Sequence, residues 1–380
     1  MRPLRVLHLV ANRWWTGSAD PALDLARSLM ERGHSVWFGC VRGDVLETHV
    51  REAGVPLVEA ISLERTALPW RLAAQIGTVR RALKDLRIDV VHTHQTHDHW
   101  LAALARRGTA ARLVRTVHHR RAVHGTPVAR WLLRQTDALI AVSEGIAGRL
   151  RSVGAAETGV SLVPGAVDAE RFDPKADGRA ARGELGLGDD VPVAGCVGRM
   201  VPGRGHDVLI RAAARLRERL PGLRVVLIGR GEHRPALEAL RQELRLEDTL
   251  VFAGYRGADL PAILAALDCL VLLGAGSEES CRAVLEGMAA GRPVVGARVG
   301  AVPEIVVDGE TGWLVDATPE AVAACLDTAL RDRERGRRMG AAGRRRVEAL
   351  FTPSRRASLV EGVYGGVLTK EAFPAGEASV

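Results

Sequence analysis

The stretch ALDCLVLLGAGSEESCRAVLEGMAAGRPVVGA, residues 266–297, decides the fold of this chain. Its two ends, 266–274 and 292–297, are short apolar runs that favour buried strands, and residues 279–290 between them favour a helix. A strand, a helix and a second strand in this order make a unit in which the two strands run parallel. The stretch therefore predicts one β–α–β unit of a parallel sheet.

The same alternation of apolar runs and amphipathic stretches continues along the whole chain. Repeated alternation of this kind predicts parallel sheets with right-handed crossovers, so we expect an α/β protein of two doubly wound, Rossmann-like domains. Ligands of such sheets bind at the carboxyl ends of the strands, which predicts that the domains face each other across a cleft. The expected strands are 4–10, 36–39, 55–60, 90–94, 113–117, 138–143 and 160–164, then 191–200, 223–229, 249–255, 266–274, 292–297 and 312–316, with helices such as 21–34 and 68–88 between them.

The length of the chain also indicates two domains, because 380 residues exceed what one hydrophobic core usually serves. Residues 171–190 are rich in Gly and charge and have no long apolar period, which is typical of a linker. We therefore expect an N-terminal domain at 1–170 and a C-terminal domain at 191–353. A terminal helix at about 354–370 is expected to pack back on the first domain.

The composition is that of a globular protein, with 47% apolar and 26% charged residues. No apolar stretch is long enough to span a bilayer, and the N-terminal apolar run is too short for a signal peptide. Five scattered cysteines argue against disulfides and against a cysteine zinc site. We expect a cytoplasmic protein, with a peripheral position at the inner face of the membrane as an alternative.

Positive charge is concentrated in one segment. Eight arginines and no acidic residue lie between Asp98 and Asp137, and the formal net charge of the chain is +8. Such a segment attracts phosphates or anionic lipid headgroups, although a solvated arginine face is an equal alternative. Nucleic acid is not an expected partner, because no recognition motif accompanies the charge. The arginines are 106, 107, 112, 115, 120, 121, 130 and 134.

Two acidic residues, Glu278 and Glu286, flank the start of the helix predicted at 279–290. The first turn of a helix favours anions, so a diphosphate would fit there. The two carboxylates, about 12 Å apart along a helical path, could then accept hydrogen bonds from sugar hydroxyls on either side. The alternative is that the acids only complement the helix dipole and solvate its surface.

Two further loops favour the anion-binding interpretation. Arg199 and Arg204 lie in GRMVPGRG, residues 198–205, at the carboxyl end of the first strand of the second domain. Two guanidinium groups at this spacing can clamp a diphosphate and neutralise a leaving group. Gly229, after the next strand, allows the backbone to approach a ligand closely.

With these motifs the sequence resembles the retaining GT-B glycosyltransferases of glycosyltransferase family 4, also called glycosyl transferases group 1. The resemblance covers nearly the whole chain. It rests on Glu278 and Glu286 in an E-x7-E pattern, on the loop of Arg199 and Arg204, and on four stretches of the first domain, namely DVVHTH (89–94), VRTVHH (114–119), ALIAVSEGIAGRL (138–150) and VPGAVDAERF (163–172).

The resemblance implies a role for each matching residue, with the first domain on the acceptor side and the second binding the donor. Arg199 and Arg204 would hold the donor diphosphate and Glu286 the ribose, while Glu278 and His118 would lie at the donor sugar as the catalytic residues. His94 and His97 are assigned to the acceptor side. The other predicted donor-binding residues are Gly17, Gly229, Glu279, Ser280, Cys281 and Arg282.

Among the places where the chain departs from the family pattern, two concern predicted donor-binding residues of the second domain. Arg204 stands where the family commonly has Lys, and Glu279-Ser280-Cys281 replaces the usual Gly-Phe-Gly. The second change adds charge and bulk close to the donor sugar.

Several histidines cluster around residues 92–99 and 118–124, and they allow two interpretations. A metal site is one, but the two groups follow different strands and no Cys or paired carboxylate joins them. We prefer residues that line the floor of the cleft, with packing histidines as the alternative for His92 and His99. We expect neither a metal nor a cofactor, because the chain has no D-x-D and the arginines can replace a metal ion.

The predicted function is transfer of a sugar from a nucleotide diphosphate to an acceptor hydroxyl with retention of configuration and without a metal. The expected partners are a nucleotide sugar, a carbohydrate or lipid-linked acceptor, and an anionic membrane surface. The resemblance points to carbohydrate, lipopolysaccharide or cell-envelope biosynthesis. The alternatives are a nucleotide-sugar epimerase or hydrolase on the same fold, and a nucleotide-sugar binding protein without catalysis.

Overall fold

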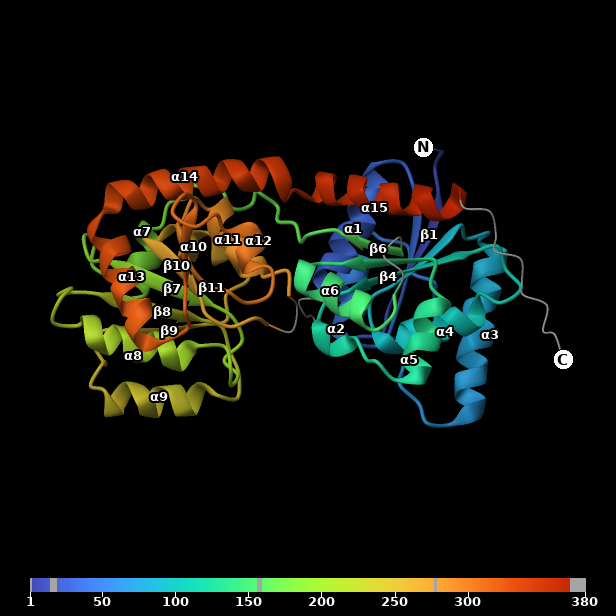
Figure 1. The fold of residues 1–380 in the computed structure, drawn as a ribbon, viewed down its shortest axis with the longest axis horizontal. Coiled ribbons are helices and arrows are strands. Elements are labelled where there is room, and N and C mark those ends of the chain that lie inside the picture. The colour runs from blue at the N-terminus through green and yellow to red at the C-terminus, as the bar shows by residue number, and fades with distance from the viewer. Residues whose placement is uncertain (1, 14–18, 156–158, 277–278, 370–380) are drawn as a thin grey trace. The chain divides into compact units, whose positions relative to one another are not determined.

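The computed structural model describes residues 2–13, 19–155, 159–276 and 279–369. The chain divides into two compact units, shown as ribbons in Figure 1. The first unit comprises Met1–Val163 and Ser354–Val380, and the second comprises Pro164–Pro353.

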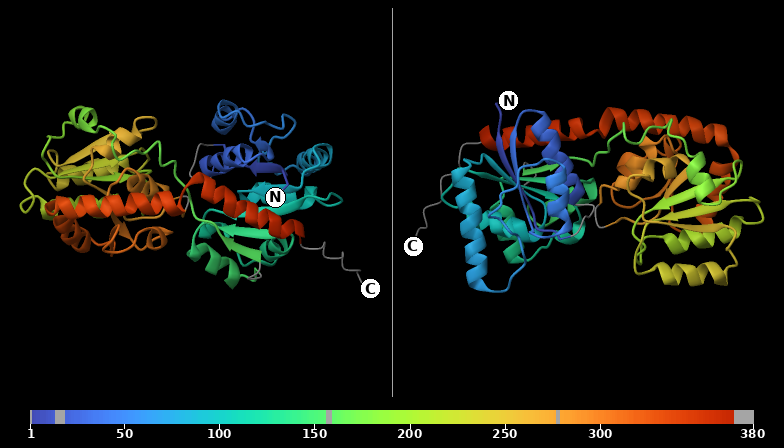
Figure 2. Two further views of the ribbon diagram at one scale, coloured as in Figure 1. Left: turned by 90° about the horizontal axis from the view of Figure 1, so that it is seen from above. Right: turned by 180° about the vertical axis from the view of Figure 1, so that it is seen from behind.

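The first unit is built on a six-stranded parallel sheet in the order β2-β1-β3-β4-β5-β6. Helices cover both faces of the sheet, with α1, α2 and α15 packed on one face and α3 and α4 on the other (Figure 2). The strands are β1 (Arg5–Val10), β2 (Ser35–Cys40), β3 (Val90–Thr93), β4 (Arg112–Val117), β5 (Ala138–Ala141) and β6 (Val160–Leu162). The helices are α1 (Ala19–Glu31), α2 (Val45–Glu52), α3 (Pro69–Asp85), α4 (Thr96–Ala105), α5 (Pro127–Arg134), α6 (Glu144–Ser152) and α15 (Pro353–Thr369), with a 3₁₀ turn, η1, at Arg120–Ala122.

The strand predicted at 55–60 does not form. Residue Leu57 makes one isolated parallel bridge with Phe38 of β2. The amide of Phe38 donates to the carbonyl of Pro56 at 2.8 Å, and the amide of Val58 donates to the carbonyl of Phe38 at 2.9 Å. Pro56 has no amide hydrogen, and this segment runs past the edge of the sheet, so the ladder does not extend.

The second unit repeats the architecture with a parallel sheet in the order β12-β11-β10-β7-β8-β9. Residues of each strand alternate between two core clusters, one under α10, α11 and α14 and the other under α8, α9 and α13. The strands are β7 (Val193–Val197), β8 (Arg224–Ile228), β9 (Leu250–Gly254), β10 (Cys269–Leu272), β11 (Val294–Ala297) and β12 (Gly312–Val315). The helices are α7 (Arg179–Glu184), α8 (His206–Leu216), α9 (Arg234–Glu243), α10 (Leu260–Ala265), α11 (Arg282–Ala289), α12 (Val302–Ile305), α13 (Pro319–Arg331) and α14 (Arg333–Leu350). The two sheets confirm the predicted α/β class with two doubly wound domains.

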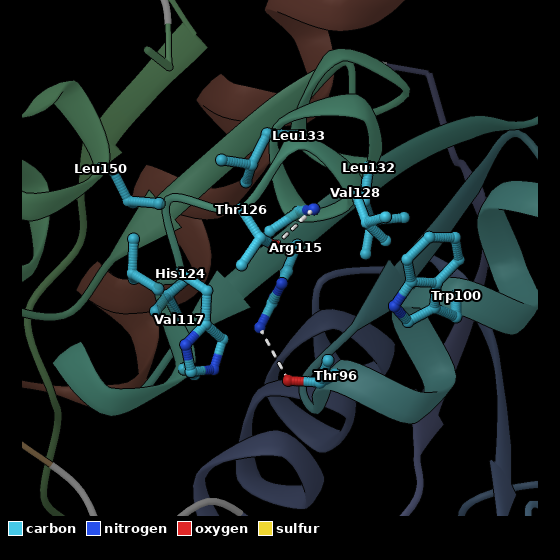
Figure 3. Close-up of a pocket in the computed structure, with 13 residues that line it drawn as sticks. Thr96, Trp100, Arg115, Val117, His124, Thr126, Val128, Leu132, Leu133 and Leu150 are labelled. Atoms are coloured by element: carbon cyan, nitrogen blue, oxygen red, sulfur yellow. Dashed lines mark hydrogen bonds between the residues drawn. The ribbon is translucent and has the colours of Figure 1, made fainter. Parts of the chain in front are cut away.

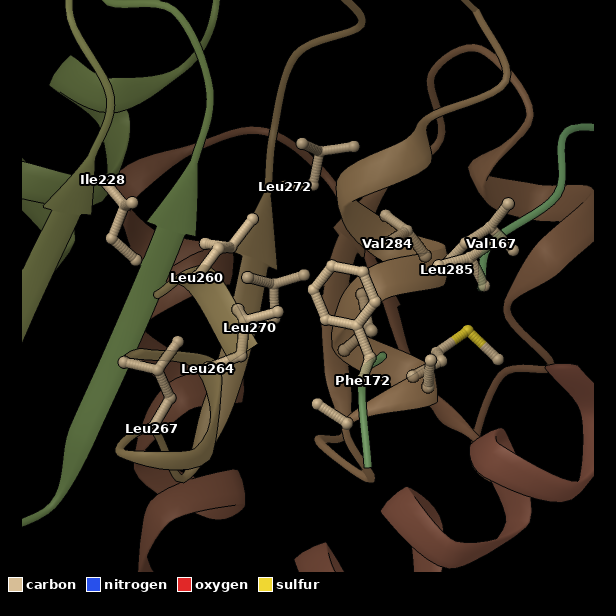
Figure 4. Packing of buried hydrophobic residues seen from close by; sticks show 14 of the residues in the cluster. Val167, Phe172, Ile228, Leu260, Leu264, Leu267, Leu270, Leu272, Val284 and Leu285 are labelled. Carbon is tan, nitrogen blue, oxygen red and sulfur yellow. The ribbon is translucent and has the colours of Figure 1, made fainter. Parts of the chain in front are cut away.

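Residues 171–190, predicted as a linker, are instead part of the second unit and include α7. Phe172 is 1% exposed and packs in the same cluster as Leu270 and Leu285, as Figure 4 shows. Ala181 and Leu187 are buried in this cluster as well. Each of these apolar residues stands alone in a polar stretch, so hydrophobic periodicity does not reveal their burial.

Helix α15 belongs to the first unit. Its residues Ala357, Val360 and Tyr364 are buried in the cluster that also contains β1 and α1. Arg32, directly after α1, forms a two-pronged ion pair with Glu361, with both nitrogen–oxygen distances 2.7 Å. Among the described residues, no helix is both long enough and apolar enough to cross a membrane.

Candidate functional site

In the second sheet the direction of winding reverses at β7. This strand lies between β8 and β10, so the chain proceeds outward on one side through β8 and β9 and on the other through β10, β11 and β12. Ligands of doubly wound sheets bind outside the carboxyl ends of the strands at such a reversal. The loops that follow β7, β8 and β10 are therefore where a ligand of this unit is expected.

Glycines bring these three loops into backbone contact. A Cβ atom on Gly229, whose φ is +144°, would lie 2.0 Å from the carbonyl oxygen of Gly198. A Cβ on Gly231 would lie 2.1 Å from the carbonyl oxygen of Met200, and one on Gly274 would lie 2.5 Å from that of Gly203. A side chain cannot be accommodated at such distances, so these positions require glycine. The missing side chain of Gly229 thus leaves room for the backbone of Gly198, and the expected approach of Gly229 to a ligand stays a prediction.

Arg204 lies at the reversal, with its guanidinium between two glycines. A Cβ on Gly198 would lie 2.6 Å from Nη2 of Arg204, and a Cβ on Gly276 would lie 2.2 Å from Nη1. Burial lowers the pKa of Arg204, and the positive charge of Arg199 adds to this effect. Within the described part of the chain, no acid forms an ion pair with Arg204 and no acceptor hydrogen-bonds to it. A largely buried cation without a counter-charge is unfavourable unless an anion binds beside it.

Arg199 differs from Arg204 in exposure and in partner. Its side chain is 68% exposed, and Nη2 lies 3.7 Å from a carboxylate oxygen of Glu232. A salt bridge between two exposed groups is weak, so Arg199 can exchange this partner for a ligand at little cost.

Helix α8 begins directly after these arginines. Gly205 at its N-cap has a φ of +75°, and a Cβ there would lie 2.5 Å from Cβ of Leu273. The next residue, His206, is 2% exposed, and burial together with the charge of Arg204 lowers its pKa to about 4. Neither ring nitrogen of His206 has a hydrogen-bond partner among the described residues. The sequence analysis missed this histidine, although its position right after GRG on the anion-binding loop could have drawn attention to it.

The helix predicted at 279–290 is shorter than expected, since α11 spans Arg282–Ala289. Cys281 precedes it in a left-handed conformation with a φ of +53°, which is a strained geometry for a residue other than glycine. The predicted distance of about 12 Å between Glu278 and Glu286 assumed a continuous helix and does not apply here. Glu278 and Gly17, both predicted site residues, lie outside the described residues.

The residues around this turn are buried. Glu279, Ser280 and Cys281 are 1%, 3% and 5% exposed, so the bulk added at these positions is turned into the unit. Glu286 is 7% exposed and accepts a hydrogen bond of 2.9 Å from Nε of Arg282 on the same helix. The Arg282–Glu286 pair therefore orients a carboxylate that the sequence analysis assigned to ribose.

The first unit joins histidines from three neighbouring strands in a buried row. Nδ1 of His8 lies 3.1 Å from Nε2 of His94, and Nδ1 of His94 lies 3.2 Å from Nε2 of His118. His94 follows β3 and His118 follows β4, and these two strands are paired. The sequence analysis treated the two histidine groups as separate because they follow different strands. They meet because parallel strands end at the same edge.

The row has a preferred direction of hydrogen bonding. Burial lowers the pKa of His8 to about 3 and that of His94 well below the usual value, so each ring is neutral and has one N–H. Nε2 of His8 has no hydrogen-bond partner in the described part of the chain, and the charge of Arg356 acts on this ring. The charge of Arg356 disfavours an N–H on Nε2 of His8 and favours a lone pair there. This favours a row in which His8 donates to His94 and His94 donates to Nε2 of His118.

His92 and His97 do not join the row through hydrogen bonds. Nδ1 of His92 lies 2.7 Å from the Tyr364 hydroxyl and Nε2 lies 2.8 Å from Oγ1 of Thr116, as befits a packing histidine. His97 on α4 instead hydrogen-bonds to the backbone of Glu64, and burial lowers its pKa.

One group of three histidines among the described residues, His8, His92 and His94, has ring nitrogens within 4.8 Å of one another and could hold a metal ion. A metal bound there would have to displace hydrogen bonds of His92 and His94, and it would lie near the charge of Arg356. The donor set thus suits hydrogen bonding better than metal binding.

The sequence analysis allowed for a solvated arginine face. The arginine-rich segment does not form one continuous exposed face. Arg106 and Arg112 both pair with Asp137, and Arg115 is only 4% exposed. Arg107 stacks over the ring of Trp131 at 5.5 Å. The exposed arginines that remain are 107, 120, 121, 130 and 134.

Comparison with known proteins agrees with this architecture. The model of the family described as glycosyl transferases group 1 matches residues 177–346, and that of glycosyltransferase family 4 matches residues 16–171. Two solved structures share the fold. A glycosyltransferase from Rickettsia africae has a TM-score of 0.87 at 18% identity, covering 98% of this chain and 100% of its own. An Anabaena protein in complex with UDP and glucose has a TM-score of 0.82 at 19% identity, covering 96% and 100%.

Two relatives are more similar to this chain in amino-acid sequence than these two solved structures are. A GDP-mannose-dependent alpha-(1-6)-phosphatidylinositol monomannoside mannosyltransferase of Mycolicibacterium smegmatis is 36% identical over 258 residues, which is 64% of this chain and 67% of the relative. A D-inositol 3-phosphate glycosyltransferase of Stackebrandtia nassauensis is 33% identical over 347 residues, which is 84% of this chain and 78% of the relative. The chain therefore belongs to glycosyltransferase family 4 and is a glycosyltransferase with the GT-B fold.

Proposed function

We propose that the protein transfers a sugar from a nucleotide diphosphate to an acceptor hydroxyl, with retention of configuration and without a metal ion. The name of one relative supports an activated sugar as donor, because that relative is GDP-mannose-dependent.

The observation that carries the proposal is Arg204, which is largely buried at the reversal of the second sheet and has no acid paired with it among the described residues. The donor diphosphate supplies the missing negative charge. Arg199 on the same loop adds a second guanidinium, and the first turn of α8 adds backbone amides. Two arginines and a helix N-terminus can neutralise the leaving diphosphate, which is the task that a metal ion performs in other transferases.

His118 is proposed to act at the donor sugar. With its hydrogen on Nδ1 it can donate a hydrogen bond to a sugar hydroxyl, and the row from His8 through His94 keeps it in this tautomer. Glu286, held by Arg282, is proposed to accept from the ribose, since a carboxylate accepts several hydrogen bonds. The roles of Glu278 and Gly17 rest on the family resemblance.

The proposed acceptor is an inositol compound, either a soluble inositol phosphate or a phosphatidylinositol glycolipid. Both kinds are in the names of relatives that are at least 33% identical. A lipid-linked acceptor would bring the protein to an anionic membrane surface, and the exposed arginines 107, 120, 121, 130 and 134 would favour this contact.

The proposal is tested with purified protein, GDP-mannose or UDP-glucose, and inositol 3-phosphate or phosphatidylinositol in vesicles. We expect one donor and acceptor pair to yield a glycoside and a nucleoside diphosphate in equal amounts, unchanged by EDTA. Proton NMR of the product should show the anomeric configuration of the donor. Free sugar instead of a glycoside would indicate a hydrolase, an isomerised donor would indicate an epimerase, and donor binding without turnover would indicate a binding protein.

A further inference from the structure

The first unit contains a cavity of about 260 Å³ at the carboxyl end of β4, lined by residues of α4, β4, α5 and α6 (Figure 3). Most of its wall is apolar, with Val117, Val123, Leu132, Leu133, Leu150 and Trp100 among the lining residues. Val128 also lines the cavity and is 60% exposed, so the wall continues to the surface of the protein. This volume is slightly below the range of about 300–1,000 Å³ that is typical of small-molecule sites, so only a small ligand would fit.

A buried guanidinium lies in the middle of this apolar wall. Arg115 comes from β4 and is 4% exposed, and Figure 3 shows its side chain between His124 and Val117 on one side and Trp100 on the other. Nη1 lies 2.8 Å from Nδ1 of His99, and Nη2 lies 3.4 Å from Oγ1 of Thr96. Nε has no hydrogen-bond partner among the described residues.

Among the described residues, no carboxylate pairs with Arg115. The charge of Asp98 acts on Arg115, but the oxygens of Asp98 accept from the amides of Ala11 and Gln95, each at 2.9 Å. Burial lowers the pKa of Arg115 to about 10 and raises that of Asp98 to about 7. A buried cation without an ion pair is costly in a protein that binds nothing there.

Arg115 has more hydrogen-bond donors than the described residues around it have acceptors for. A guanidinium has five N–H groups in a planar fork. Two of them are used by His99 and Thr96, and the other three have no acceptor in the described part of the chain. A carboxylate or a phosphate offers paired oxygens that match such a fork.

We propose that this cavity binds a small anionic amphiphile, in which a carboxylate or phosphate monoester meets Arg115 and a short hydrocarbon segment packs on the apolar wall. The apolar side chains exclude a purely polar ion, and the guanidinium disfavours a neutral hydrocarbon. The proposal is independent of the donor site in the second unit.

The test is isothermal titration calorimetry of the full chain, in the absence of any nucleotide sugar, with octyl phosphate and octanoate as probes. Octanol and inorganic phosphate each lack one half of the amphiphile. We expect at least one of the two anionic probes to bind, with octanol and inorganic phosphate at least tenfold weaker. Trp100 lines the cavity, so its fluorescence should change with the binding probe only. Equal affinity for octanol, or binding of neither anionic probe, would overturn the proposal.

Two variants test the location. Arg115→Met should weaken the binding probe at least tenfold while its unfolding temperature, without ligand, stays equal to or above that of the wild type, because a lone buried charge is removed. If Arg115 served only to stabilise the fold, the Arg115→Met variant would instead unfold at a lower temperature than the wild type.

Val128→Glu tests the mouth of the cavity without disturbing the core. It places a negative charge at an exposed position and should weaken the anionic probe at least tenfold. Val45→Glu is the matched control, since Val45 is 45% exposed on α2 and does not line the cavity. Wild-type affinity in the Val128 variant, or equal loss in both valine variants, would contradict the assignment even if the Arg115 variant failed to fold.

Discussion

Replacing Arg204 by Gln should weaken the binding of GDP and UDP more than the same change at Arg199. A hydrogen-bonded contact to a charged group contributes about 1.5–3 kcal/mol, which corresponds to roughly 10- to 150-fold in Kd. Arg204 should show this full effect because it is largely buried and, within the described ranges, no acid pairs with it. Arg199 is 68% exposed and paired with Glu232, so its loss should cost about 1 kcal/mol or less.

The glycines beside Arg204 provide a second way to remove the same contact. Gly276→Ala places a Cβ 2.2 Å from Nη1 of Arg204, so the guanidinium must move although its charge remains. The clash involves the far end of a flexible side chain, so the unit should still fold. We expect an effect on binding in the same range as Arg204→Gln, and the double variant should lose little more than either single variant.

Isothermal titration calorimetry with GDP and UDP measures these effects, and thermal unfolding confirms that each variant is folded. Arg211→Gln is the control, because it removes one exposed positive charge from α8. Its affinity should change less than twofold at physiological salt, where exposed charges are screened. Wild-type affinity of Arg204→Gln, or fully additive losses in the double variant, would show that Arg204 does not hold the diphosphate.

Three further predictions concern the histidine row and the glycine contacts. Burial strongly depresses the pKa values of five histidines, so the unfolded chain binds more protons below about pH 6.5 and stability falls as the pH drops; they are His8, His92, His94, His99 and His206. Each contributes about 1 kcal/mol between pH 6.5 and 5.5, and the raised pKa of Asp98 offsets about one of them. The free energy of unfolding from urea titrations should therefore decrease by roughly 4 kcal/mol over this interval, and a flat profile would refute this. His94→Leu removes the donor that orients His118 and should lower kcat by about tenfold or more with little change in the KM for the donor. ¹⁵N NMR should show that His118 is no longer held as the Nδ1–H tautomer, and an unchanged kcat and tautomer would contradict the row. Gly229→Ala meets a backbone oxygen at 2.0 Å and should destabilise the second unit by about 3 kcal/mol or more, which denaturant unfolding measures.

Much of the fold follows from local patterns in the sequence. Apolar runs of strand length, alternating with amphipathic stretches, predicted both parallel sheets, because strands buried on both faces are continuously apolar. The errors occurred where this signal is weak. At 55–60 an apolar run beside Pro56 forms only a bridge, and at 171–190 isolated apolar residues such as Phe172 are buried without any periodicity.

The loops of the candidate site could also be located from the sequence, since loops at the carboxyl ends of strands carry the ligands in such sheets. Spacing alone could not show that Arg204 fits between Gly198 and Gly276, nor that Cys281 breaks the predicted helix. These contacts join residues from different strands, and their distances depend on the order of the strands in the sheet.

The sequence by itself determined the class of fold, the family and the loops that carry charged groups, because these depend on residue types at short range along the chain. Only the tertiary structure decided which charges are buried and which rings touch. Arg115 resembles its exposed neighbours in the sequence, yet it is 4% exposed beside an apolar cavity. His8 and His118 are far apart in the chain, yet His94 connects them. The physical reason is that strand order and the packing of helices set the burial and the partners of each side chain, and both arise from contacts between distant parts of the chain.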